Sequence, residues 1–261
     1  MIDRTPADPS ILDRFWSEGW AVIPDVLSAP EVTAARSALV DAAAASEASG
    51  MPVRLNALDP GGRNIRVYDL VAHARVFADL AEHGAVLPSI EALVGNDVIL
   101  SNFTANTALP GSGSMEPHCD QSTIMPGPWP VMMAMNAIWC LHDIDETNGA
   151  TRFLPGSHRF ESYDDVPEDP RDEMRSFAAS AGSVILMHGR LWHTSGENRS
   201  ADRDRALLFA FYTAGHLRAQ TNWWRSIPAE VQRELSPRLQ ALCSLDFGNM
   251  AHGGYLAGGA R

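Results

Sequence analysis

Hydrophobic residues recur every three or four positions through the first third of the chain, which is the spacing of amphipathic helices. A short helix is predicted at residues 9–19, before a strand at 20–23. A longer helix is expected from Ser28, because Ser28 and Glu31 fit the S-x-x-E capping box that starts many helices. Two further segments show the same spacing, so helices are expected over about residues 8–95.

After Asp97 the pattern changes to short runs bounded by prolines and glycines, in which strands are expected. The predicted strands lie at residues 97–107, 131–141, 151–154, 183–188 and 205–213. Many short strands of this kind are typical of a sandwich or a jelly roll. A final hydrophobic pattern predicts one C-terminal helix over about 226–245, packed on a β core of about 97–215.

Two polar segments interrupt these elements. Residues 46–64 carry several glycines and prolines and are interpreted as a mobile loop. Such a loop either closes over a binding site or is a simple surface connection, and both readings stay open. Residues 159–175 are acidic and are expected to form a long surface loop.

The size and charge of the chain limit the classes of function. A chain of 261 residues that is 45% hydrophobic can bury a large core, so one domain over 1–261 is the simplest expectation. The formal net charge of −12 argues against nucleic acid or an anionic membrane as partner, because both need a basic surface. The same charge counts mildly against a coenzyme-A thioester as substrate.

No run of apolar residues is long enough to span a bilayer, and the first residues lack the features of a signal peptide. A cytoplasmic protein is therefore expected. The three cysteines are widely spaced, which indicates neither a disulfide framework nor a C-x-x-C zinc site. The oligomeric state stays open.

The candidate chemistry begins with the tripeptide His118-Cys119-Asp120. If it lies on a strand, the His118 and Asp120 side chains point to the same face. His193 follows the predicted strand at 183–188. Two histidines and one carboxylate can hold one side of a metal ion, as in the facial triad of non-heme iron(II) oxygenases. An H-x-D tripeptide alone is a weak signal, because the chain has 9 histidines and 32 acidic residues.

Arg205 opens the alternating strand at 205–213, on the face shared by Leu207, Phe209 and Phe211. A buried guanidinium is costly unless it is paired, and its planar fork binds carboxylates through two hydrogen bonds. A carboxylate ligand is therefore the natural partner of Arg205.

With these residues the chain resembles the phytanoyl-CoA dioxygenase-like family of iron(II)- and 2-oxoglutarate-dependent oxygenases. The resemblance extends from about residue 12 to about residue 245. It is carried by the H-x-D tripeptide, the run N-G-A-T-R-F-L-P-G-S-H at 148–158, the segment W-H-T-S-G at 192–196, Arg205, and the opening at 15–24.

The resemblance implies a double-stranded β-helix, that is, a cupin-like jelly roll that is mainly β with flanking helices. It implies that His118, Asp120 and His193 bind Fe(II), which 2-oxoglutarate chelates before O2 reacts. Arg205 would bind the far carboxylate of 2-oxoglutarate, and the Thr151 hydroxyl would donate a hydrogen bond to it. The family's arginine commonly lies at the position that is Asp204 here, and Arg205 is preferred to Arg203 because it directly precedes the strand.

Five more residues lie near enough to the triad in sequence to contact substrate or co-substrate: Gln121, Trp129, Met135, Asn136 and Trp192. Gln121 is favoured among them as a co-substrate contact. Cys119 is expected to point away from the triad into the core, and His158 is expected to be structural.

The function expected is a dioxygenase that oxidises, most simply hydroxylates, a C–H bond of a small organic molecule and releases succinate and CO2. Related halogenases lack the carboxylate, so Asp120 favours hydroxylation, desaturation or ring formation. The aromatic residues at 129–139 suit an apolar substrate, with a secondary metabolite as one candidate, but would equally fill a core. Two alternatives remain, namely a 2-oxoglutarate-independent cupin-type metal enzyme and an inactive binding protein of the same fold.

Overall fold

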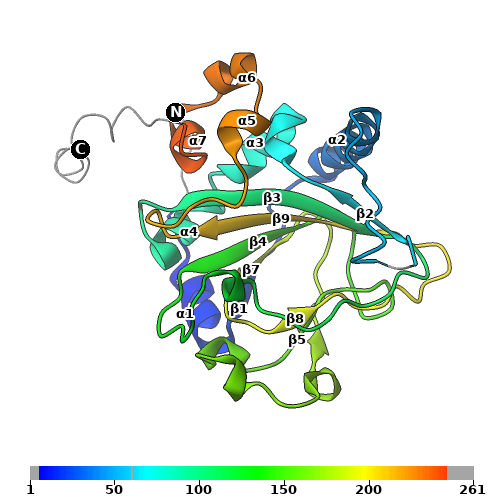
Figure 1. Cartoon of the computed structure of the whole chain (residues 1–261), viewed down its shortest axis with the longest axis vertical. Helices are drawn as coiled ribbons and strands as arrows, with labels where there is room; N and C mark the ends of the chain where they lie inside the picture. Colours follow the sequence, from blue (N-terminus) through cyan, green and yellow to red (C-terminus); the bar gives the residue numbers. More distant parts are fainter. Residues whose placement is uncertain (1–5, 60, 246–261) are drawn as a thin grey trace.

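The structure is a computed structural model that describes residues 6–59 and 61–245. Both ends of the range 1–261 expected for one domain lie outside the described residues. The α-helices gather at the two ends of the chain (Figure 1). They are α1 Pro9–Glu18, α2 Ala29–Ala48, α3 Arg75–Ala81, α4 Leu87–Val94, α5 Trp223–Ser226, α6 Ala229–Glu234 and α7 Pro237–Leu242.

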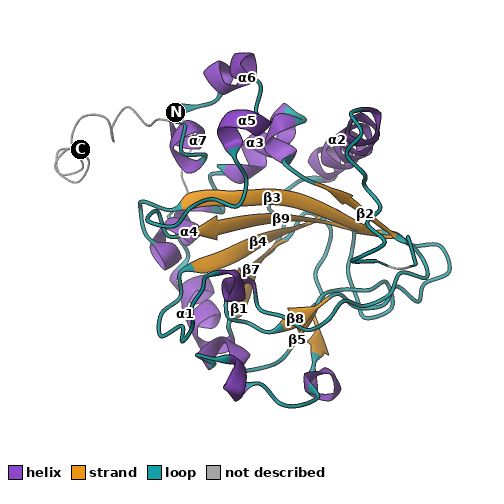
Figure 2. Ribbon diagram, in the orientation of Figure 1, coloured by secondary structure: helices purple, strands orange, loops and turns teal. Residues whose placement is uncertain are grey.

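Two antiparallel sheets form the centre of the molecule (Figure 2). The main sheet has the order β1-β7-β4-β9-β3-β2, with β1 Trp20–Ile23, β2 Asn64–Val67, β3 Ile99–Ala108, β4 Ala134–Cys140, β7 Val184–His188 and β9 Arg205–Thr213. The smaller sheet has the order β6-β5-β8, with β5 Arg152–Phe153, β6 Arg175–Ser176 and β8 His193–Thr194. The expected fold class, mainly β with flanking helices and consistent with a jelly roll, is confirmed. The sheets do not close into a barrel over the described residues.

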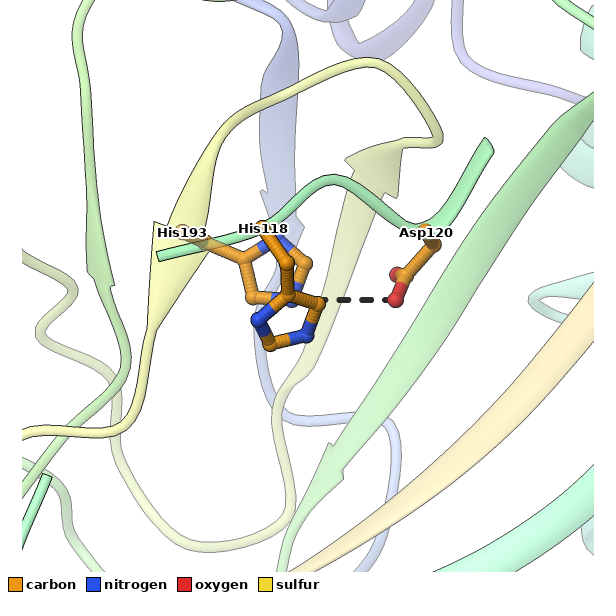
Figure 3. Close-up of side chains that lie close together, drawn as sticks. All are labelled: His118, Asp120 and His193. Atoms are coloured by element: carbon orange, nitrogen blue, oxygen red, sulfur yellow. Dashed lines mark ion pairs between the residues drawn. The ribbon is translucent and has the colours of Figure 1, made fainter. Parts of the chain in front are cut away.

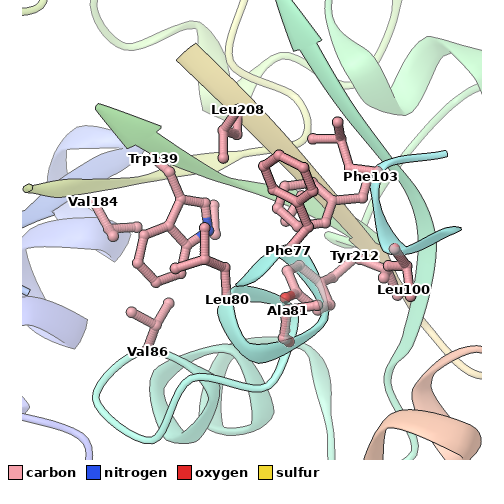
Figure 4. Close-up of a cluster of buried hydrophobic side chains, with 14 of the residues drawn as sticks. Phe77, Leu80, Ala81, Val86, Leu100, Phe103, Trp139, Val184, Leu208 and Tyr212 are labelled. Atoms are coloured by element: carbon pink, nitrogen blue, oxygen red, sulfur yellow. Dashed lines mark hydrogen bonds between the residues drawn. The ribbon is translucent and has the colours of Figure 1, made fainter. Parts of the chain in front are cut away.

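Helices cover one face of the main sheet. In Figure 1, α2, α3 and α5 to α7 lie on that side, while β5 and β8 lie on the other. Side chains alternate between the two faces of a strand, and on β4 Met135, Ala137 and Trp139 point to the helices. Figure 4 shows part of this apolar core, in which Phe77 and Leu80 of α3 pack near the strand residues. Within residues 6–59 and 61–245, no helix has both the length and the apolar character that crossing a bilayer requires.

The other face of the main sheet looks toward the smaller sheet. A second apolar cluster joins Ile138 and Cys140 of β4 and Met187 of β7 to Phe153 of β5. This cluster packs the two sheets against each other.

The C-terminal region corrects an expectation. One helix was predicted over 226–245, but three short helices occupy 223–242. Pro228 is the N-cap of α6 and Pro237 is the first residue of α7. Proline lacks the N–H that a helix interior needs and disfavours helical geometry in the residue before it, so a continuous helix cannot form here.

His158 takes the structural role expected of it. The helix α1 ends at Gly19, whose φ of 81° lies in the left-handed region, and whose N–H donates to the Phe15 carbonyl. A Cβ atom at Gly19 would lie 2.6 Å from the ring of His158, which is itself buried. The turn that follows β5 therefore packs directly on the corner between α1 and β1.

This contact predicts a large cost for Gly19→Ala. An alanine in the left-handed backbone conformation lowers the free energy of unfolding by about 1–2 kcal/mol. Steric overlap with a core side chain lowers it by about 1–3 kcal/mol more. Gly50→Ala is the matched control, because Gly50 has a φ of 85° but nothing within 4 Å of the added carbon. Chemical denaturation should show a loss of about 1 kcal/mol for Gly50→Ala and clearly more for Gly19→Ala. Equal losses would show that the His158 contact is unimportant.

Candidate metal centre

His118 and His193 face each other across an isolated antiparallel bridge. The His118 N–H donates to the His193 carbonyl at 2.9 Å, and the His193 N–H donates back to the His118 carbonyl at 2.8 Å. Residues directly opposite in such a pair carry their side chains on the same face. The two imidazole rings accordingly lie side by side, with centroids 4.5 Å apart.

Asp120 reaches the same spot by a different local structure from the one predicted. Cys119 is extended, with φ −120° and ψ 143°, but Asp120 begins a short 3-10 helix, η2 Asp120–Thr123. The tripeptide therefore does not lie on a strand: His118 forms an isolated bridge, and the extended Cys119 backbone suffices to place the flanking side chains on one side. Cys119 itself points into a buried cluster with Trp129 and Trp192. Burial raises the pKa of its thiol to about 11, so the thiol stays protonated.

The three side chains converge on one point (Figure 3). One donor atom from each of His118, Asp120 and His193 lies within 4.8 Å of the other two. His193 Nε2 is 3.8 Å from Asp120 Oδ1. One ion could therefore touch all three residues.

Hydrogen bonds to the backbone fix which ring nitrogen is free. His118 Nδ1 lies 2.9 Å from the Glu116 carbonyl, and His193 Nδ1 lies 2.9 Å from the Leu191 carbonyl. A carbonyl can only accept, so each Nδ1 carries a proton, and in the neutral ring the lone pair is then on Nε2. Burial lowers the pKa of His193 more than the neighbouring Asp120 raises it, which favours the neutral ring that a metal requires.

The triad opens into a cavity of about 490 Å³ that Thr151 and Arg205 also line. Arg205 is 1% exposed, and its Nε and Nη2 atoms are buried without a hydrogen-bond partner among the described residues. Burial, reinforced by the charge of Arg66, lowers the pKa of Arg205 to about 10, so it remains a cation at neutral pH. Arg203 lies at the surface, where it forms an ion pair of 2.8 Å with Asp145. Of the two candidate arginines, Arg205 is the one in the cavity.

Comparison with known proteins identifies the family of the chain. The model of the phytanoyl-CoA dioxygenase family matches residues 15–206. The chain belongs to this family. The predicted resemblance is thereby confirmed.

Among the relatives of this family member, dioxygenase af480 of Aspergillus fumigatus is 43% identical over 241 residues, which are 92% of this chain and 76% of the relative. Dioxygenase aneA of Aspergillus aculeatus is 27% identical over 70% of this chain and 63% of its own length. Multifunctional dioxygenase ausE of Aspergillus calidoustus is 32% identical over 51% of this chain and 48% of its own length. The family and the names of these relatives support an oxygenase.

Gln121 does not contact the cavity, contrary to the prediction. Its side chain is fully buried, its Nε2 donates to the Val131 carbonyl at 2.8 Å, and its Oε1 accepts from the Met133 N–H at 2.9 Å. Both ends of the amide are therefore used to hold the segment before β4. The predicted contact was based on proximity to Asp120 in the sequence, but the turn of η2 directs the Gln121 side chain away from Asp120.

The aromatic residues at 129–139 also belong to the core. Trp139 packs under the helices and Trp129 packs beside Cys119. The aromatic wall of the cavity comes instead from Phe209 and Phe211 on β9. Of the two roles left open for Trp129 and Trp139, packing in the core is the one they have, and Phe209 and Phe211 form the apolar surface of the cavity.

Arg66 is a cavity residue that the sequence did not indicate. Its guanidinium binds Asp59 through two hydrogen bonds, of 2.7 and 3.0 Å, and Leu58 beside Asp59 also lines the cavity. The segment predicted as a loop at 46–64 thus borders the site at its C-terminal end. A lone arginine in the short strand β2 offered no signal, because its partner lies in a loop with no regular pattern.

The role found for Gln121 predicts a loss of stability in Gln121→Leu. The substitution keeps the bulk but removes the hydrogen bonds to the Val131 carbonyl and from the Met133 N–H, at a cost of roughly 1–3 kcal/mol for the two. Thermal unfolding of the metal-free protein measures this directly. An unchanged melting temperature would contradict the structural role and reopen the co-substrate role.

Proposed function

We propose that the protein is an Fe(II)- and 2-oxoglutarate-dependent dioxygenase. It oxidises, most simply hydroxylates, a C–H bond of a small organic molecule and releases succinate and CO2. The observation that carries this proposal is the presence in one cavity of a His-Asp-His donor set and a buried guanidinium, two of whose nitrogens have no partner within residues 6–59 and 61–245. Succinate release that depends on 2-oxoglutarate and rises with a true substrate is the direct test.

The donor set fits iron(II). His118 and His193 each direct Nε2 toward the common point, and Asp120 directs Oδ1 toward it. Two imidazoles and one carboxylate on one side of an ion are the donors of the facial triad, which leaves the other positions open. When bound, iron(II) with 2-oxoglutarate and O2 supplies the oxidation, and these residues hold and orient the ion.

The buried guanidinium fits the far carboxylate of 2-oxoglutarate. Arg205 keeps its charge inside the cavity and has hydrogen-bond donors without partners, which is costly unless a ligand pairs with them. Thr151 lines the same cavity and is 4% exposed, so its hydroxyl can donate to the same carboxylate. This need for a carboxylate favours 2-oxoglutarate dependence over a cupin-type metal enzyme that works without it.

The rest of the cavity supports a small organic substrate. Phe209 and Phe211 give it an apolar wall, and its volume of about 490 Å³ is in the range of small-molecule sites. An inactive binding protein has no need for three converging ligands with fixed tautomers, so turnover is the better explanation of the site. Asp120 supplies the carboxylate whose absence marks the related halogenases, which supports oxidation of the C–H bond.

The metal assignment predicts that His193→Ala loses stoichiometric Fe(II) binding, because one of three ligands disappears and the site opens. His216→Ala is the control, since His216 is exposed and is not a member of the donor set. Anaerobic titration followed by metal analysis of the desalted protein gives the stoichiometry. Full Fe(II) loading and full activity in His193→Ala would rule out the assignment.

The co-substrate assignment predicts different effects for the two arginines. Arg205→Gln removes a charged donor from a buried site and should weaken 2-oxoglutarate binding about 10- to 100-fold. Arg203→Gln removes only a surface ion pair and should leave binding unchanged. The visible charge-transfer band of the iron chelate, followed during anaerobic titration with 2-oxoglutarate, reports the affinity. The reverse ranking would move the carboxylate site to Arg203.

A further inference from the structure

Asn136 is the one polar side chain in the strand β4, whose sequence is A-M-N-A-I-W-C. All seven residues are buried, and Asn136 is 5% exposed. Its Nδ2 donates to Asp120 Oδ2 at 2.7 Å. A strand otherwise built for the core thus carries an amide at the position that meets the candidate metal ligand.

The chemistry of the pair fixes the orientation of the amide. A ligating carboxylate is ionised and can only accept hydrogen bonds, so the amide nitrogen must face it. The other carboxylate oxygen, Asp120 Oδ1, is the one that lies 3.8 Å from His193 Nε2. The two oxygens are therefore divided, with Oδ2 on Asn136 and Oδ1 toward the histidines.

The other polar atom of the same amide lowers the stability of the protein. Asn136 Oδ1 is buried and has no hydrogen-bond partner among the described residues. A buried acceptor without a donor is unfavourable, and an apolar side chain at this place would avoid the penalty. Since the neighbours in the sheet, Met187 and Phe211, are apolar, the fold itself gives no reason for an amide here.

We propose that Asn136 is a positioning residue for the metal centre. By holding Asp120 Oδ2, its Nδ2 makes the carboxylate present Oδ1 alone, so that Asp120 binds through one oxygen. A carboxylate that bound through both oxygens would occupy a coordination position that the co-substrate needs. The inference rests on the proposed function, and it adds a residue that acts through Asp120 and touches no metal itself.

The test compares metal affinity with stability in two variants of Asn136. Asn136→Leu keeps a branched side chain and removes both the unpartnered acceptor and the hydrogen bond to Asp120. These two changes act in opposite directions, so the metal-free protein should melt close to the wild-type temperature. Asn136→Ala leaves a cavity and should melt lower. Both lack the donor, so both should bind Mn(II), measured by the EPR signal of the free ion, about 10- to 100-fold more weakly than wild type.

Asn106→Leu is the matched control. Asn106 lines the same cavity from β3, is also 5% exposed and also has an unpartnered Oδ1, but makes no hydrogen bond to the donor set. It should keep the wild-type Mn(II) affinity. A purely structural role of Asn136 would make affinity follow melting temperature, so that Asn136→Leu would bind as wild type does.

The outcomes separate the two proposals. If wild type and Asn106→Leu bind one Mn(II) and both Asn136 variants bind it equally tightly, the role of Asn136 is overturned while the metal site stands. If wild type binds no Mn(II) or Fe(II) at a single site, the proposed function and the role of Asn136 fall together. A common loss of affinity in Asn136→Leu and Asn136→Ala, despite their different stabilities, is the expected result.

Discussion

Two backbone hydrogen bonds between His118 and His193 set the geometry on which the site depends. They join two distant segments of the chain so that both imidazoles leave the backbone on the same face, with no adjustment of either side chain. The register is decisive, because a slip of one residue would put Cys119 in the place of His118 and send Asp120 to the opposite face. The extended Cys119 and the start of η2 then add Asp120 to the pair.

The two faces of the main sheet have different roles: one packs against the helices and the other lines the cavity. Along β9, Ala206, Leu208 and Ala210 pack under the helices, while Arg205 and Phe209 on the opposite face reach the cavity. The helix side therefore supplies the apolar burial that holds the sheet together. The inner side can then keep groups that are unfavourable for stability, such as the Arg205 guanidinium, two nitrogens of which lack a hydrogen-bond partner in the described part of the chain.

Local patterns in the sequence predicted much of this, and their failures have identifiable causes. The hydrophobic spacing located the N-terminal helices and the main strands, because it reflects which face of each element is buried. The prediction of a single C-terminal helix was wrong because new helices begin at Pro228 and Pro237. The prediction that Gln121 contacts the co-substrate was wrong because nearness in sequence does not give the direction of a side chain once the backbone turns.

Most of the elements, the faces of the strands and the residue types that can bind a metal and a carboxylate follow from the order of residues along the chain. Which of these residues meet depends on the tertiary structure. It placed Arg205 in the cavity and Arg203 on Asp145, and it brought Asn136 to Asp120 and Arg66 to Asp59. Such pairings are distances between segments that the fold brings together, and a periodic pattern records only the environment of each segment, not the identity of its neighbour.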